Sequence, residues 1–338
     1  MITLGIIGVG RWGPNILRNF IGMDGVRVEA VCDSDNKRLE AITKRYPEIK
    51  TTTDTADIIG NRQLTCTVIA TPLSTHFPLA KRALEAGQHV FVEKPLANTS
   101  KECLDLIEIA EKGNLILFVG HTFKYNAGIM AAKTYIENNE LGKIYLMDAN
   151  RTNLGPVRSD ANALWDLASH DVSIFSYWIG DTPKSVSANG GCYLNKTVED
   201  VVYATFEYRN GIIAHVHASW LNPRKIREIT VVGEKKMLVW NDMNLSEPIR
   251  IYNMGFDRED IYQDSFTDFR LSIREGEVII PRIKLNEPLM AECAHFIECV
   301  KTGRQPLTDG YDGLHVVKAL EAATQSIREQ SRIIKIEQ

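Results

Sequence analysis

The sequence predicts two parts of different fold class: an α/β domain with a doubly wound parallel sheet, then an α+β domain with a large, mostly antiparallel sheet. In residues 1–122, apolar strand-like runs alternate with helix-length segments, which is typical of βαβ units. In residues 123–338, several strand-like runs follow one another directly, and the closing segment is able to pack back on the first domain. A chain of 338 residues is long enough to bury two cores.

The elements of the first domain follow from apolar runs and from helix start and stop signals. Ile2–Ile7 is apolar throughout and ends at Gly8, as expected of a parallel strand covered on both faces. Pro14 suits the first turn of a helix, and Thr99 with Glu102 matches a capping box that starts another. Further strands are predicted at 27–32, 67–70, 89–92 and 115–119, and further helices at 36–46, before Gly87, and up to Gly113.

The second domain is predicted to contain strands in series and two closing helices. Asn210-Gly211 separates two alternating runs and predicts a hairpin turn between them. A helix beginning at about Trp165 is expected to run to Gly180, whose glycine ends it. The strands are predicted at 144–151, 184–192, 201–208, 212–220, 226–232 and 237–240, and the closing helices at 289–302 and 313–329.

Composition and charge exclude several classes of protein. A formal net charge of -4 with mixed signs gives no basic surface for nucleic acid or an anionic membrane. No apolar run approaches the roughly 18 residues that a membrane helix needs. The N-terminal residues lack the basic region of a signal peptide. The six cysteines are scattered without a C-x-x-C pair, so we expect free thiols and a cytoplasmic protein.

The segment from Gly8 to Gly13 fits G-x-G-x-x-G, the fingerprint of a dinucleotide-binding Rossmann domain. The string lies between the first strand and the helix begun by Pro14, which is the context that the fingerprint requires. Asp33 ends the second strand twenty residues after Gly13, where a carboxylate accepts hydrogen bonds from ribose hydroxyls and repels a 2′-phosphate. The pattern predicts NAD, although Lys37 and Arg38 leave NADP open. The alternative is a structural glycine turn with a solvated Asp33.

Two further patterns carry candidate catalytic residues. Glu93-Lys94-Pro95 follows the fourth predicted strand, at the carboxyl edge of the sheet, where ligands of open α/β folds bind. A lysine there is suited to stabilising an alkoxide, or it is an ordinary solvated loop residue. Asp166 and His170 are four residues apart, so one helix face presents both, and an oriented imidazole is a natural general base. The alternative is a surface pair with Asp166 as a cap; no third ligand points to a metal.

In their order along the chain, these motifs resemble the Gfo/Idh/MocA oxidoreductase family. The similarity covers essentially the whole chain, from the glycine loop through Glu93-Lys94-Pro95 and Asp166-x-x-x-His170 to the segment 308–314. The resemblance implies that Lys94 and His170 are catalytic, that Asp166 orients the histidine, and that the Lys94–Pro95 bond is cis. It also implies nucleotide contacts from Gly8, Gly10, Arg11, Trp12, Gly13, Asp33, Arg38, Thr71, His76, Glu93 and Lys94.

Within the family, the chain resembles members that act on nucleotide-linked amino sugars, with UDP-N-acetylglucosamine 3-dehydrogenase as the nearest activity. The segments 10–15, 120–126 and Arg158-Ser-Asp-x-Asn-Ala-Leu-Trp-Asp166 carry that likeness. It implies an NAD-dependent dehydrogenase that oxidises a secondary hydroxyl of a sugar or nucleotide sugar. The polar residues expected to contact the substrate are Lys94, Asn126, Arg151, Asn153, Arg158 and His170. For Asn126, Arg151, Asn153 and Arg158 the alternative is a hydrated loop between the domains.

Two other functions remain open: an NAD-dependent glycosidase of the same fold, and a non-catalytic nucleotide sensor. Retention of Lys94, Asp166 and His170 argues against the sensor. The sheet of the second domain is expected to expose Trp220 and Val232, which indicates a homodimer or homotetramer. His215 and His217 alternate along one strand and are expected on such a face rather than at a metal.

Overall fold

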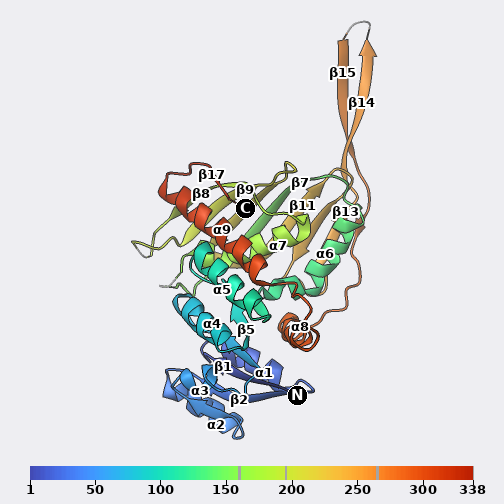
Figure 1. Ribbon diagram of the computed structural model, residues 1–338. Helices are drawn as coiled ribbons and strands as arrows, with labels where there is room; N and C mark the ends of the chain where they lie inside the picture. The colour runs from blue at the N-terminus through green and yellow to red at the C-terminus, as the bar shows by residue number, and fades with distance from the viewer. Residues whose placement is uncertain (159–160, 195, 264–265, 338) are drawn as a thin grey trace. The chain divides into compact units, whose positions relative to one another are not determined.

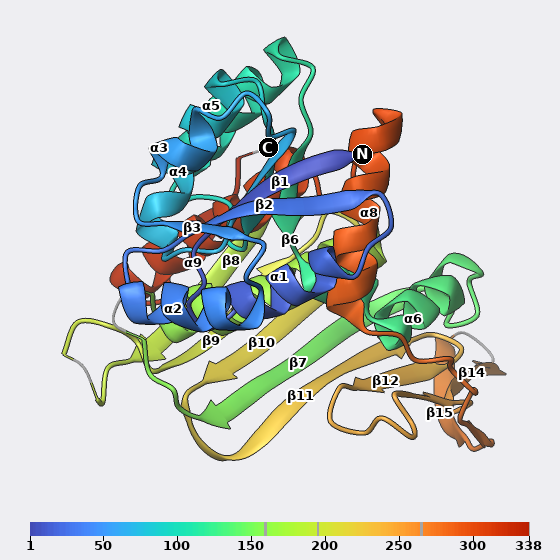
Figure 2. The same ribbon diagram turned by 90° about the horizontal axis from the view of Figure 1, so that it is seen from below.

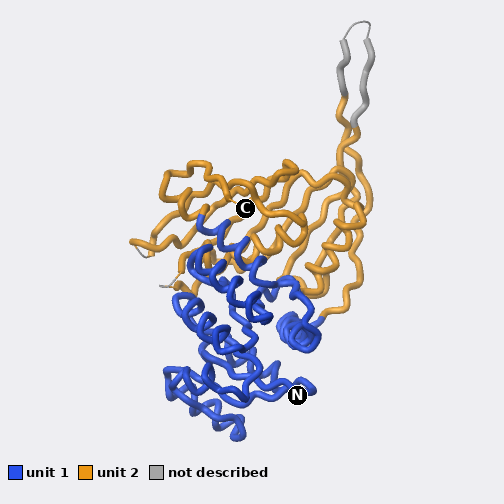
Figure 3. The backbone as a smooth tube through the Cα atoms, in the orientation of Figure 1, with its two compact units in different colours: residues 1–125, 286–321 blue, residues 126–285, 322–338 orange. Residues whose placement is uncertain are grey.

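The computed structural model describes residues 1–158, 161–194, 196–263 and 266–337. The chain forms two compact units, residues 1–125 with 286–321 and residues 126–285 with 322–338 (Figure 3). The first unit therefore includes a late segment of the chain, which carries the helix α8 (Pro288–Thr302). Among the helices that the structure describes, none is long and apolar enough to cross a membrane.

The first unit is built on a six-stranded sheet in which every pair of neighbours is parallel. The order is β3-β2-β1-β4-β5-β6. Strands are therefore added toward one edge of the sheet from β1 to β3 and toward the other edge from β4 to β6, with the switch between β1 and β4. This is the doubly wound order of a dinucleotide-binding sheet, whose ligands bind beyond the carboxyl ends of the strands at that switch point. The strands are β1 (Ile2–Ile7), β2 (Val26–Cys32), β3 (Lys50–Thr52), β4 (Cys66–Ile69), β5 (His89–Glu93) and β6 (Leu117–Gly120).

Helices cover both faces of this sheet, with α1 and α2 on one face and α4 and α5 on the other (Figure 2). Thr99 caps α5 by accepting a hydrogen bond from the backbone N–H of Glu102, as the capping box predicts. The helical segments are α1 (Gly13–Ile21), α2 (Asn36–Arg45), α3 (Ala56–Ile59), η1 (Leu73–Thr75), α4 (His76–Glu85), α5 (Ser100–Lys112) and η2 (Thr122–Tyr125).

An aromatic cluster fixes α8 to the first unit. Phe296 of α8 packs edge-on against Phe91 of β5 and Phe118 of β6, with ring centroids 5.6 and 5.4 Å apart. Phe20 of α1 meets the same ring at 6.2 Å, and all four side chains are fully buried. Burial of rings of this size contributes about 1.5–3 kcal/mol each, before the preference for edge-to-face contact. The late helix is thus part of the core beside β5 and β6.

The second unit is built on a nine-stranded sheet of order β16-β13-β12-β11-β7-β10-β9-β8-β17. Every neighbouring pair is antiparallel except β7 with β10, which confirms the predicted mostly antiparallel class. The strands are β7 (Ile144–Leu154), β8 (Ser185–Gly191), β9 (Val201–Glu207), β10 (Ile213–Ser219), β11 (Leu221–Gly233), β12 (Met237–Asn241), β13 (Ile249–Tyr252), β16 (Val278–Ile279) and β17 (Ile334–Lys335).

The predicted hairpin is present as β9 and β10. The N–H of Tyr208 donates to the carbonyl of Ile212 at 2.9 Å, and Gly211 has a φ of 85°, a conformation that favours glycine. The sequence interpretation missed a separate two-stranded ribbon, β14 (Gly255–Gln263) with β15 (Phe266–Arg274), which extends away from the nine-stranded sheet (Figure 1).

The helical segments of the second unit include a short π-helix, η3. It spans Leu164–Ala168 and leads directly into α7 (Ser169–Ile179), which ends at Gly180 with a φ of 73°. The remaining helices are α6 (Ala127–Glu137), which the sequence interpretation missed, and α9 (Gly310–Arg328), within which the chain passes from the first unit to the second.

The expectation that Trp220 lies on an exposed sheet face is wrong. Only 1% of its surface is exposed, because it falls between β10 and β11, where strict alternation of side chains is broken. Its indole N–H donates to Asp166 at 3.3 Å. Val232 is half-buried, and Leu146, Ile213 and Tyr203 are the exposed apolar side chains of neighbouring strands, at 40%, 48% and 41%.

Candidate functional site

The glycine loop lies between β1 and α1, and each of its glycines meets a different demand. Gly8 has a φ of 96°, and a Cβ there would lie 2.5 Å from the carbonyl oxygen of Ala70. A Cβ on Gly13 would lie 2.1 Å from the carbonyl oxygen of Gly8. Gly10 has only the Arg38 guanidinium within contact range, 3.4 Å from such a Cβ. Gly8 and Gly13 therefore allow the turn itself, and Gly10 leaves one side of it open.

Asp33 holds the loop to the end of β2. One carboxylate oxygen accepts from the backbone N–H of Val9 at 2.8 Å, and the other accepts from that of Asp35 at 2.9 Å. The side chain is 6% exposed, and the half-exposed Arg38 guanidinium lies 3.4 Å away. The predicted cofactor residues Gly8, Gly13, Asp33 and Arg38 thus come together in one place.

These residues fit a dinucleotide. A Cβ at Gly10 would fill the open side of the loop, and helix α1, whose N-cap residue is Trp12, has no side-chain cap. Its first N–H groups and its dipole therefore favour an anionic pyrophosphate. Arg11 and Trp12 are both exposed beside the loop. NAD is the cofactor that this arrangement accommodates, with Asp33 set against an added 2′-phosphate.

His76 joins the two turns that follow β4 and β5. One ring nitrogen lies 2.8 Å from the carbonyl oxygen of Pro95, and the other lies 2.9 Å from that of Thr71. The ring is 2% exposed, and the Lys94–Pro95 bond is cis, as the resemblance implied. Thr71 also accepts a hydrogen bond from the hydroxyl of Thr75 at 2.7 Å. In this structure, Thr71 and His76 position the turn that carries Lys94.

Glu93 ends β5 inside the protein. Its Oε2 accepts from the backbone N–H of Lys94 at 3.2 Å, and the Trp12 indole also donates to the carboxylate. Burial raises the pKa of Glu93 to about 7, against the charge of Lys94. A buried carboxyl group with a raised pKa thus lies at the strand end that carries the candidate lysine.

A second buried group, which the sequence interpretation missed, lies beyond β6. The side chain of His121 is 1% exposed, and its Nε2 lies 3.9 Å from Asp312, which forms an ion pair with Lys124. Burial lowers the pKa of His121 to about 4, with Lys124 and Lys94 acting in the same direction and Asp312 opposing. The separation of residues 121 and 312 along the sequence does not predict this contact, because only the packing of the folded chain brings the two side chains together.

In the second unit, Asp166 lies in the π-helix η3 and His170 in the first turn of α7. The predicted helix therefore contains a local widening between the two residues, a feature frequent at functional sites. Asp166 accepts from the Arg158 guanidinium at 3.2 Å and from the Trp220 indole at 3.3 Å. The structure thus brings the predicted residues Arg158 and Asp166 together, next to a half-buried His170. Ser159 and Asp160 of the same motif lie outside the described residues.

Arg151 has surroundings that do not support its predicted substrate role. Two nitrogens of its guanidinium donate to the two carboxylate oxygens of Asp171, at 2.8 and 2.7 Å. Both side chains are 2% exposed. A bidentate pair of this kind is already satisfied and stabilises the packing of β7 against α7.

Asn126 and Asn153 also bond within the protein. The Asn126 side chain caps α6 by accepting from the N–H groups of Gly128 and Ile129, and it donates to Asp242 at 3.3 Å. This cap is the signal that the sequence interpretation overlooked for α6. The Asn153 amide donates to the carbonyl of Gly155.

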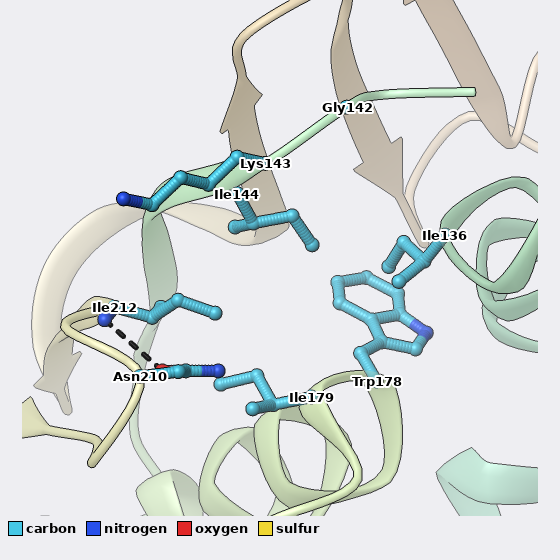
Figure 4. Close-up of a pocket in the computed structure, with 8 residues that line it drawn as sticks. All are labelled: Ile136, Gly142, Lys143, Ile144, Trp178, Ile179, Asn210 and Ile212. Carbon is cyan, nitrogen blue, oxygen red and sulfur yellow. Dashed lines mark hydrogen bonds between the residues drawn. The ribbon is translucent and has the colours of Figure 1, made fainter. Parts of the chain in front are cut away.

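Two further features contain none of the predicted site residues. His215 and His217 lie on β10 beside Tyr203, whose ring stacks on His217 at 4.3 Å. A pocket of about 300 Å³ lies elsewhere in the second unit, where Trp178 and isoleucine side chains face a common space (Figure 4). It is lined by Ile136, Gly142, Lys143, Ile144, Trp178, Ile179, Asn210 and Ile212.

Two family models match the chain. One, described as an oxidoreductase family with an NAD-binding Rossmann fold, matches residues 2–121, and the GFO/IDH/MocA C-terminal domain matches residues 129–239. The chain belongs to the Gfo/Idh/MocA oxidoreductase family. The resemblance inferred from its motifs is confirmed, and the chain is an NAD-dependent oxidoreductase.

Relatives of this family member extend over nearly its whole length. The scyllo-inositol 2-dehydrogenase (NAD(+)) of Bacillus subtilis is 25% identical over 340 residues, which cover 97% of this chain and 94% of that protein. The solved structure of the UDP-N-acetylglucosamine 3-dehydrogenase GnnA from Acidithiobacillus ferrooxidans has a TM-score of 0.80 at 22% identity and covers 97% and 98%. The WlbA dehydrogenase from Bordetella pertussis, solved with NADH and UDP-GlcNAcA, has a TM-score of 0.81 at 22% identity and covers 100% and 99%.

Proposed function

We propose that this Gfo/Idh/MocA oxidoreductase oxidises a secondary hydroxyl group of a sugar or nucleotide sugar, with UDP-N-acetylglucosamine 3-dehydrogenase activity as the specific candidate. The observation that carries the proposal is the position of Lys94 at the carboxyl end of β5, one strand beyond β4, which borders the switch point of the parallel sheet. The similarity of fold to two dehydrogenases of nucleotide sugars supports the choice of substrate class.

The chemistry divides among three residues. NAD, when bound, supplies the acceptor for the hydride. His170 takes the proton of the substrate hydroxyl as a general base, and Lys94 stabilises the negative charge that develops on the same oxygen. Asp166, itself fixed by Arg158 and Trp220, orients the imidazole. A positioned base of this kind typically contributes about 10²–10⁴ in rate.

Arg158 is the residue of the second unit that we assign to the substrate. Its side chain is 37% exposed while one guanidinium nitrogen bonds to Asp166. An arginine suits the diphosphate of a nucleotide sugar, because its planar fork matches phosphate oxygens. Asn126 and Asn153 keep a smaller part in this proposal, since their side chains already bond within the protein.

The deciding experiment is a substrate screen with NAD, in which NADH formation is followed by absorbance and products are identified by mass spectrometry. The panel contains UDP-N-acetylglucosamine, free N-acetylglucosamine, myo-inositol and scyllo-inositol, with a Lys94→Ala and His170→Ala double variant as the control. Oxidation of the UDP-linked sugar alone supports the specific activity. Cleavage of a glycoside without net NADH identifies an NAD-dependent glycosidase instead, and NAD binding without turnover on any sugar identifies a sensor.

We further propose a homodimer or homotetramer, assembled through the open face of the nine-stranded sheet. Ile213 of β10 pairs with Leu146 of β7, which pairs with Val232 of β11, so apolar side chains adjoin across three strands. A face of this kind is usually buried by another subunit. Light scattering tests the assembly, and a mass of 38 kDa at micromolar concentration rejects it. The six free cysteines support a cytoplasmic location.

A further inference from the structure

Two carboxyl groups lie together in the interior of the first unit, and the reaction assigned above uses neither as an acid or base. Glu93 ends β5, and Glu292 lies in α8, about two hundred residues later. The hydroxyl of Thr122, just beyond β6, donates to Glu292 Oε2 at 2.7 Å. Glu93 is 8% exposed and Glu292 is 0% exposed. Glu93 pairs with Gly120 across β5 and β6, and Thr122, two residues after Gly120, holds Glu292 where α8 packs against η2. The charge of Glu93 therefore acts on Glu292.

Each carboxyl group keeps one oxygen without a hydrogen-bond partner among the described residues, and in both cases it is a buried Oε1. Two ionised carboxylates in this position would be desolvated and would repel one another. Lys94 supplies one positive charge beside Glu93. The buried pair therefore has compensation for one negative charge rather than two.

Among the described residues, Lys94 is the cation whose charge acts on Glu93, and the charge that acts on Glu292 is that of Glu93 itself. Burial raises the pKa of Tyr125 and of Cys293, the residue that follows Glu292, so both stay neutral. Thr122 and Trp12 contribute neutral donors. A proton is the remaining means of removing the second negative charge.

We propose that Glu93 and Glu292 hold one proton between them, that Glu292 carries it, and that Glu292 thereby acts as a positioning residue for the Glu93 carboxylate. The assignment to Glu292 follows from the donors that each group receives. Glu93 accepts from the Lys94 N–H and the Trp12 indole and lies beside a lysine, all of which stabilise the ion. Glu292 accepts from one hydroxyl group and is completely buried.

The protonated Glu292 becomes a donor whose unpartnered oxygen suits the unpartnered oxygen of Glu93. The Glu93 carboxylate is then held between Trp12 of the glycine loop and α8. In the bound state it presents a fixed acceptor to the cofactor; this last step rests on the proposed function. Loss of the donor from Glu292 should weaken cofactor binding while leaving the loop and Asp33 unchanged.

Infrared spectroscopy of the protein without added cofactor tests the proton directly. At about pH 8, ordinary carboxyl groups are ionised, since a glutamate has a pKa of about 4.3. We expect a C=O stretching band of a buried carboxylic acid that disappears in Glu292→Gln and persists in Glu93→Gln. Glu287→Gln at the N-cap of the same helix, where Glu287 pairs with Arg18 and accepts from Asn19, is the matched control and should keep the band. Absence of the band from the unmodified protein, or its persistence in Glu292→Gln, overturns the proposal.

NAD binding by calorimetry tests the positioning role. The amide of Glu292→Gln still donates, so its Kd should stay within about threefold of the unmodified protein. Glu292→Met has a similar volume and no donor, and its Kd should rise by about tenfold, as expected for a lost hydrogen bond to a charged group. Equal affinity in the two variants excludes the positioning role. If the unmodified protein does not bind NAD, the proposed function fails, while the infrared result still decides where the proton lies.

Discussion

The backbone N–H of Val9 donates a 2.8 Å hydrogen bond to the carboxylate of Asp33. The residue that we expect to select against a 2′-phosphate is therefore also the residue that holds the glycine loop at the end of β2. Selectivity and loop geometry depend on one side chain, so a substitution there changes both.

Asp33→Ser should weaken NAD binding by about tenfold and reduce the preference for NAD over NADP. The loop loses a charged acceptor, worth about 1.5–3 kcal/mol, and the repulsion of a 2′-phosphate disappears. Titration of both cofactors by fluorescence quenching measures the change. Asp35→Ser, which alters the cap of α2, is the control and should leave the preference unchanged. Tighter binding of NADP than NAD by the unmodified protein would contradict the role of Asp33.

His170→Ala and Lys94→Ala should each lose turnover by about 10²–10⁴, and NAD affinity should stay within a few-fold in His170→Ala. The base is absent in the first variant, and the oxygen loses its positive charge in the second. We expect the lysine variant to be at least as impaired, because no other group is assigned to that oxygen. Steady-state kcat with NAD affinity provides the measurement, and Lys81→Ala on the exposed face of α4 is the control. Near-normal turnover in both variants would contradict the roles assigned to Lys94 and His170.

Arg151→Met should destabilise the protein by about 3–5 kcal/mol, because it leaves Asp171 buried and unpaired. The double variant Arg151→Met with Asp171→Leu should recover most of that loss, since both charges are removed together. Urea unfolding at constant pH measures the free energy of unfolding. A folded double variant also tests the discarded substrate role: an unchanged KM supports a purely structural pair, and a large rise in KM restores Arg151 to the substrate site.

The pKa of His121 is lowered from 6.5 to about 4 in the folded protein. The unfolded chain thus binds a proton more readily in this range, and the free energy of unfolding should fall as pH is lowered from about 6.5 to about 4. His121→Gln should remove that contribution and flatten the profile. Urea unfolding across this range provides the test, with His215→Gln in the second unit as the control. Identical slopes in the unmodified protein and His121→Gln would exclude His121 as the source.

The predictable parts of the fold rest on local patterns. The apolar run Ile2–Ile7, the glycine loop, the capping residue Thr99 and the Asn210-Gly211 turn each act over a few residues, and the structure contains all of them. Asp33 was predictable because the spacing of a βαβ unit fixes its distance from Gly13.

The parts that escaped prediction depend on contacts between distant segments. In the sequence, nothing distinguishes Glu292 from the other polar residues of its helix, and only the packing of α8 brings it near Glu93. From the sequence alone, Arg151 is interpreted as a free cation, because its partner Asp171 lies in α7 and reaches the guanidinium only in the folded chain. Trp220 was misplaced because the interpretation extended one strand through the break between β10 and β11.

The π-helix Leu164–Ala168 makes the position of His170 depend on the number of residues before it. An α-helix turns by about 100° per residue, and a π turn accommodates one residue more. Removing Leu167 or Ala168 would restore α geometry but leave Asp166 three residues from His170 instead of four, which changes the direction of the carboxylate relative to the imidazole. Exchanges of the side chains other than Asp166 in this turn should therefore be tolerated more readily than any change in its length, and relatives that keep the chemistry should vary here by substitution alone.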